Sequence, residues 1–185
     1  ALGLAAILTA LWVGIPLEAI MLKTSDGMDD FPLLAIPFFI LAGAIMAEGG
    51  MAERIVNLAK VFVGFIRGGL ALVNILASTM FGCISGSSVA DTAAIGSVMI
   101  PQMKKAGFPV IFATNVTICG SVQALLIPPS HNAVLYSIAA GGTVSVAALF
   151  LAGVFPGLLF GICLIGLVLL TAHRRGYPKG EPIPW

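Results

Sequence analysis

The stretch FGCISGSSVADTAAIG in the middle of the chain places polar side chains between two strongly apolar runs. Ser85, Ser88 and Asp91 are candidate cation ligands, because hard cations bind hydroxyl and carboxylate oxygens. Gly86 and Ser87 lie at the point where one helix would end and another begin. We expect two half-helices here, with free carbonyls ending the first and free N–H groups starting the second.

Asp91 has two interpretations at this point. Ser88 and Asp91 have the spacing of a capping box, with Ser88 as the N-cap and Asp91 reaching back to it as a structural cap. The alternative is a direct ion ligand. An unpaired carboxylate deep in a membrane is costly, so either role must give it a partner.

A second break is predicted in the stretch ALLIPPSHN. Pro128 and Pro129 lack an N–H, and a residue that precedes proline is pushed out of the helical region. The carbonyls around Gln123 to Leu126 are therefore expected to lose their partners, and Ser130 can cap the resuming helix. A simple proline kink is the alternative. Two independent breaks favour the substrate and ion site of a secondary transporter.

Two polar residues follow this break. Asn132 is a candidate substrate contact, because its neutral amide offers both a donor and an acceptor. His131 is either a substrate donor or a structural residue bonded to nearby backbone.

The composition indicates that the protein lies in a lipid bilayer. Of the 185 residues, 59% are hydrophobic and 9% are charged, against about 25% charged in soluble domains. We therefore predict an all-α integral membrane protein. Nucleic acid is not an expected partner, because Lys and Arg form no more than short pairs. The three cysteines lie singly in apolar runs, so no thiolate metal site is expected. The chain starts without Met or a basic leader and is interpreted as a fragment that begins inside an apolar helix.

Apolar runs at 2–22 and 31–47 are each long enough to span a bilayer, with a polar loop at 23–30 between them. The predicted organisation is transmembrane helices in 1–47, an amphipathic connector helix in 48–69, a re-entrant helical hairpin in 70–106, a broken transmembrane helix in 107–140, a long transmembrane helix in 141–175 and a cytoplasmic tail or linker in 176–185.

Charge placement predicts the orientation. If the hairpin enters and returns on one face, eight of the nine basic residues share a side: Arg54, Lys60, Arg67, Lys104, Lys105, Arg174, Arg175 and Lys179. Lys23 lies on the opposite side of the membrane from these eight residues in this arrangement. The shared side is predicted to be cytoplasmic. Two full spans would satisfy the charges equally, so the shortness of the two halves is what favours re-entry.

Three motifs, PFFILAG, SGSSVADTAAIGSVMIPQMKK and IPPS, resemble the large membrane subunit of tripartite ATP-independent periplasmic (TRAP) transporters, and the resemblance covers nearly the whole chain. It implies a multi-pass protein of the bacterial inner membrane and an elevator-type, sodium-coupled importer. Such an importer works with a small membrane subunit and takes an organic acid from a periplasmic binding protein. The chain resembles the first of two inverted repeats, so the 1–47 helices would be scaffold helices.

The resemblance also implies site residues. Sodium would be held by Ser85 and Ser88 and by carbonyls before and at the second break, in Gln123, Leu126 and Pro128. Ser87, Ser130 and Asn132 would contact the substrate. Gln123 and the His131–Asn132 pair are polar where many relatives are apolar. Which acid is carried, a dicarboxylate, a sugar acid or a 2-oxo acid, is left open.

Two other functions compete with transport. Ser88 and His131 suggest an intramembrane serine hydrolase, although no GxSG loop and no orienting third residue accompany them. A passive channel or a structural membrane subunit would need no occluded site.

Overall fold

The computed structural model describes residues 2–29, 33 and 35–179, and it is helical throughout. Nine helices are found among these residues: α1 (Leu2–Trp12), α2 (Leu17–Met28), α3 (Ala35–Glu48), α4 (Met51–Val63), α5 (Gly69–Ser85), α6 (Ser88–Lys105), α7 (Val110–Gln123), α8 (His131–Ala139) and α9 (Val146–Arg175). The all-α prediction is confirmed for this part of the chain. Residues 180–185 of the expected tail lie outside the described residues.

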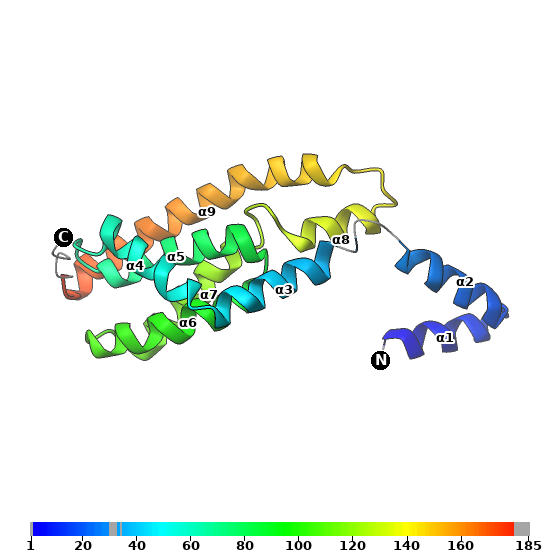
Figure 1. Ribbon diagram of the computed structural model, residues 1–185, viewed down its shortest axis with the longest axis horizontal. Coiled ribbons are helices and arrows are strands. Elements are labelled where there is room, and N and C mark those ends of the chain that lie inside the picture. The colour runs from blue at the N-terminus through cyan, green and yellow to red at the C-terminus, as the bar shows by residue number, and fades with distance from the viewer. Residues whose placement is uncertain (1, 30–32, 34, 180–185) are drawn as a thin grey trace.

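The first predicted span is wrong in its limits. Residues 2–22 form two helices, because Gly14 has a φ of 80° and Pro16 precedes α2 in extended conformation. Helix α2 then continues through most of the expected polar loop as far as Met28. Helices α1 and α2 pack on each other and lie apart from the other seven helices in Figure 1.

The connector helix is amphipathic, as predicted. Helix α4 buries Ala52, Ile55, Val56 and Ala59 against the bundle, while Glu53 and Arg54 are exposed. It follows α3 at an angle of 73° across Gly49–Gly50. Apolar residues at helical spacing on one side explain why this segment lies along the bundle.

Helices α5, α6 and α7 form the centre of the bundle, and α3, α4 and α9 flank them (Figure 1). The fully buried side chains include Val73, Phe81, Ile95 and Met99. Helices α5 and α6 have 17 and 18 residues. Both are somewhat longer than the two apolar halves of the predicted hairpin. At 1.5 Å per residue each is about 26 Å long, just short of a hydrocarbon core of about 30 Å.

The hairpin enters and returns at one end of the bundle. Arg67, just before α5, forms a β-bridge with Lys179. Phe108, just after α6, packs on Tyr177 with ring centroids 4.8 Å apart and the rings tilted by 44°. Because Tyr177 and Lys179 follow α9 directly, the start of α5, the end of α6 and the end of α9 are together. Most of the basic residues therefore gather at this end, as the charge pattern predicted.

One described helix, α9, is long and apolar enough to cross a membrane by itself, and the bent pair α3 and α4 passes the same test if it is counted as one span. The 30 residues of α9 extend about 45 Å. The predicted long helix is confirmed as a helix. The number of membrane crossings stays a prediction.

Candidate functional site at two helix breaks

The hairpin turns at Gly86. This residue adopts the left-handed conformation with a φ of 60°, and its N–H donates to the carbonyl of Gly82 at 2.9 Å. Ser87 is extended, and its hydroxyl accepts the N–H of Ala90 at 3.3 Å, which caps α6. The predicted break between two half-helices is thus confirmed at Gly86 and Ser87.

The predicted capping box is wrong by one residue. Ser87 is the N-cap, so Ser88 is the first helical residue and Asp91 lies one position beyond N3. Both carboxylate oxygens of Asp91 are buried and have no hydrogen-bond partner, so Asp91 is not a cap. The sequence alone does not identify the N-cap of α6, because each of the neighbouring serines can cap a helix. Which serine does so depends on where Gly86 ends α5.

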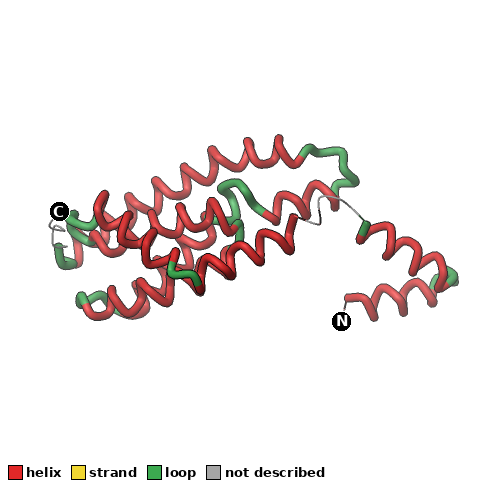
Figure 2. Tube along the Cα trace, in the orientation of Figure 1, coloured by secondary structure: helices red, strands yellow, loops and turns green. Residues whose placement is uncertain are grey.

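The second break is an irregular segment and not a simple kink. Helix α7 ends at Gln123 and α8 begins at His131 (Figure 2). Ser130 is extended and occupies the N-cap position, but the prediction that its side chain caps α8 is wrong. Its hydroxyl makes no cap bond and is buried without a partner. Residues 124–130 therefore expose backbone groups inside the bundle, as expected of a broken helix that lines a site.

The two breaks meet. A Cβ added to Gly86 would collide with the carbonyl oxygen of Pro129 and would lie 3.6 Å from Nδ1 of His131. One turn earlier, a Cβ on Gly82 would lie 2.8 Å from the Cα of Ala124. Only glycine permits such approaches between two backbones. The two breaks predicted from the sequence therefore lie side by side in the structure.

The free carbonyls differ in part from those predicted. The Gln123 carbonyl accepts the N–H groups of Leu126 and Ile127 at 3.0 and 3.2 Å. The prediction that it loses its partners is therefore wrong. Within the described chain, no hydrogen bond reaches the carbonyls of Leu126, Pro128 and Pro129.

The predicted sodium ligands included the carbonyl of Pro128 but not that of Pro129. Its carbonyl packs against Gly86, whereas that of Leu126 packs against Gly153 of α9. The missing N–H of proline was the signal for this segment, but the direction of each carbonyl depends on the irregular backbone.

The side chain of Gln123 links three helices. The hydroxyl of Thr79 on α5 donates to its Oε1 at 3.1 Å, and its Nε2 donates to the carbonyl of Gly157 on α9 at 3.2 Å. The side chain is 2% exposed and packs against Gly161. Both ends of its amide are therefore used in holding the bundle together.

Ser85 is fully buried at the hairpin tip, and its hydroxyl accepts the N–H of Ser87 at 3.5 Å. One lone pair of this oxygen remains free. Ser88 is half-buried in the first turn of α6, beside Val89, which is 78% exposed. Ser85 and Ser88 thus lie on either side of the turn at Gly86.

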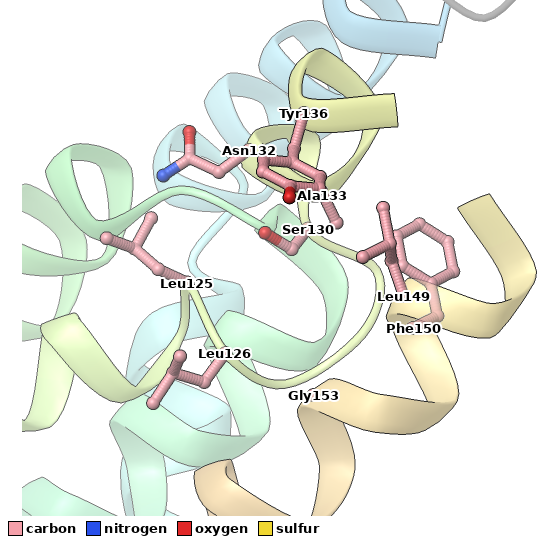
Figure 3. A pocket seen from close by; sticks show the side chains of 9 residues that line it. All are labelled: Leu125, Leu126, Ser130, Asn132, Ala133, Tyr136, Leu149, Phe150 and Gly153. Atoms are coloured by element: carbon pink, nitrogen blue, oxygen red, sulfur yellow. The ribbon is translucent and has the colours of Figure 1, made fainter. Parts of the chain in front are cut away.

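Two of the predicted substrate residues share a groove of about 360 Å³ between the second break and α9. Ser130 and Asn132 line it together with Leu125, Leu126, Ala133, Tyr136, Leu149, Phe150 and Gly153. Figure 3 shows Asn132 directed away from Leu149 and Phe150. The third predicted contact, Ser87, is not among the lining residues and serves as the cap of α6.

The geometry gives no support to a serine nucleophile. Among the described residues, no hydrogen bond joins Ser88 to His131, and Nδ1 of His131 is buried without a partner. A structural bond from this nitrogen to nearby backbone, one of the two interpretations of His131, is therefore absent from the described chain.

Comparison with known families matches residues 1–183 to the tripartite ATP-independent periplasmic transporter, DctM component. The chain belongs to this family. The predicted resemblance is confirmed, and with it the prediction of a transporter family in place of an enzyme family.

Several relatives are similar over most of the chain. An uncharacterized protein, YgiK of Salmonella typhimurium, is 49% identical over 98% of this chain and 41% of its own length. The C4-dicarboxylate TRAP transporter large permease protein DctM of Vibrio cholerae is 43% identical over 100% of this chain and 41% of its own length. The 2,3-diketo-L-gulonate TRAP transporter large permease protein YiaN of Escherichia coli is 40% identical over 84% and 36%. The chain thus spans about two fifths of these relatives.

Proposed function

We propose that this chain provides one sodium site and part of the cargo pathway in the large membrane subunit of a sodium-coupled, binding-protein-dependent importer of a small organic acid. The observation that carries the proposal is the meeting of the hairpin tip with the second break at Gly86 and Pro129. Unpaired main-chain carbonyls inside a membrane bundle need a partner, and a cation is one.

The oxygens at this junction suit sodium. The hydroxyls of Ser85 and Ser88 and the carbonyls of Pro128 and Pro129 are hard donors on adjoining segments, the chemistry that hard cations prefer. Leu126 offers a further carbonyl from the side of α9. Gln123 is removed from the ligand set, because its carbonyl and its side chain are both already bonded.

The cargo is proposed to bind beside this junction. Helices α6 and α8 both begin here, at Ser88 and His131, and helix N-termini favour carboxylates. Ser130 and Asn132 offer a hydroxyl and an amide in the adjacent groove. C4-dicarboxylates and 2,3-diketo-L-gulonate, named for two relatives, are both carboxylates, and this supports an organic acid as the class of cargo.

The proposed partners follow from the family. We propose a periplasmic binding protein and a small membrane subunit as partners, and the words tripartite, periplasmic and large permease in the names of the family and of a relative support this. We place the protein in the bacterial inner membrane as a multi-pass subunit that moves as an elevator. The exposed apolar side chains of α9, such as Leu151, Phe155 and Ile162, support contact with lipid or with neighbouring membrane helices.

Ser88→Ala in the complete permease tests the sodium site. Loss of one hydroxyl ligand should lower the apparent affinity for sodium about tenfold, which corresponds to about 1.4 kcal/mol. The measurement is the sodium concentration dependence of organic acid uptake into proteoliposomes that contain the permease, with its small subunit and binding protein added.

Ser97→Ala is the matched control. Ser97 is an exposed serine further along the same helix, and its hydroxyl donates to the carbonyl of Ala94. The control should leave sodium dependence unchanged. Wild-type sodium dependence in the Ser88 variant would contradict the proposed site, and uptake without any sodium dependence would contradict coupling itself.

A further inference from the structure

Deeper in the bundle than the hairpin tip, helices α5, α6 and α7 enclose a cluster of polar side chains. It consists of Asn74, Ser78, Asp91, Thr117 and Ser121, each at most 1% exposed. Asp91 lies about 6 Å further along α6 than the cap Ser87. The cluster is therefore separate from the junction at Gly86 and Pro129.

Part of the cluster is paired internally. Nδ2 of Asn74 donates to the hydroxyl of Thr117 at 2.7 Å, and that hydroxyl donates to the carbonyl of Ala113 at 2.9 Å. The hydroxyl of Ser121 donates to the carbonyl of Thr117 at 2.8 Å. These bonds use the available donors of the amide and of two hydroxyls, and they hold α5 and α7 in register.

The remaining oxygens have no hydrogen-bond partner within the part of the chain that the structure describes. Oδ1 of Asn74, Oγ of Ser78 and both carboxylate oxygens of Asp91 are buried and unbonded. Ser78 and Ser121 are the hydroxyl side chains beside the Asp91 carboxylate, and among the described residues neither lies in good hydrogen-bonding geometry to it. Buried oxygens gathered in this way can serve together as ligands of a hard cation.

Among the described residues, no side chain beside the cluster supplies the missing positive charge. Helices α5 and α7 contain no charged residue, and the lysines of α6 lie in its last turn. Helices α3 and α4 also pack on α6, but their charged side chains, Glu48, Glu53, Arg54 and Lys60, are not among the buried residues. A buried carboxylate without a counter-charge is strongly unfavourable. The cluster therefore needs either a proton on Asp91 or a metal cation from outside the chain.

We propose that Asp91, Asn74, Ser78 and Ser121 form a second sodium site, distinct from the one at the helix breaks. The carboxylate supplies the charge, and the amide and hydroxyl oxygens complete a hard, all-oxygen set. An ion held there joins α5, α6 and α7, so sodium binding stiffens the hairpin that carries the first site.

Asp91→Asn in the complete permease is the test, because it keeps the shape of the side chain and removes its charge. The number of sodium ions bound per purified permease, measured with radioactive sodium by equilibrium dialysis, should fall by about one. Ser88→Ala, measured in parallel, should weaken the other site and leave the Asp91 site filled. The two proposals can therefore fail separately. Asp26→Asn, at an exposed carboxylate on α2, should change nothing.

An unchanged sodium count in a folded Asp91→Asn permease would overturn the inference, since a proton on Asp91 would then satisfy the carboxylate. Ser78→Ala covers the case in which the Asp91 variant does not fold, because it removes one ligand and keeps the charge. It should lower sodium affinity at one site about tenfold, and wild-type affinity at every site would equally overturn the proposal.

Discussion

At the scale of single residues, glycine decides how closely the two breaks approach. Gly86 combines a left-handed backbone with direct contact to the Pro129 carbonyl. A side chain is disfavoured there twice, once by the backbone conformation and once by the neighbouring oxygen. Gly82 has ordinary helical backbone, so at that position only the contact with Ala124 requires glycine.

A left-handed backbone costs a residue with a Cβ about 1–2 kcal/mol. We predict that Gly86→Ala destabilises the permease by more than this amount, because the added methyl group also forces the two breaks apart. The same displacement should weaken sodium binding. Thermal unfolding and sodium titration measure the two effects. Gly176→Ala is the matched control. Gly176 also ends a helix with a φ of 67°, but nothing lies within 4 Å of its added Cβ. Equal sodium affinity in both variants would argue against contact between the breaks at the ion site.

At the scale of elements, the broken helix needs a support, because its last turn has lost the regular helical pattern. Gln123 supplies it by bonding to Thr79 on α5 and to Gly157 on α9. The end of α7 is thereby fixed to two neighbours just before the irregular segment. This amide positions the free carbonyls without binding the ion itself.

Gln123→Ala should lower the stability of the permease by about 1–3 kcal/mol, because the hydrogen bonds that tie the end of α7 to Thr79 on α5 and to Gly157 on α9 are lost and a buried side chain is removed. The melting temperature of the purified permease measures this loss. Gln102→Ala on α6 is the control, since the half-buried side chain of Gln102 makes no hydrogen bond among the described residues. A melting temperature that falls no further for Gln123 than for Gln102 would remove Gln123 from this supporting role.

At the scale of the whole molecule, the site lies well inside the bundle. Gly157, which faces the second break, is about 27 Å along α9 from its basic end at Arg175. The hairpin starts and finishes at that same end, through Arg67 and Phe108. A site at this depth, with most basic residues at one end, is the arrangement expected if that end faces the cytoplasm.

Orientation can be tested with a single cysteine. Lys104→Cys, in a permease whose Cys83, Cys119 and Cys163 are replaced by Ala, should react with a membrane-impermeant thiol reagent only from the cytoplasmic side. Ser25→Cys on the exposed face of α2 should react only from the periplasm. Labelling of position 104 in intact cells from outside would reverse the proposed topology.

The sequence by itself determined that the described chain is helical and where the two central helices must break. Gly86, Pro128 and Pro129 are local conformational signals, and their effects on backbone dihedrals need no knowledge of neighbours. The basic residues likewise marked one end of the bundle. Gly14 and Pro16 carried the same kind of signal near the start of the chain, but the apolar run around them was interpreted as one span.

Only the tertiary structure decided which polar groups are used and which are free. The main-chain carbonyl of Gln123 and the carboxylate of Asp91 were both candidate ligands. The Gln123 carbonyl accepts two N–H groups and its side-chain amide is bonded at both ends, whereas neither oxygen of Asp91 is bonded among the described residues. The physical reason is that hydrogen-bond satisfaction is a property of pairs. Thr79 and Gly157 reach Gln123 from helices far away in the sequence, and no local pattern encodes that approach.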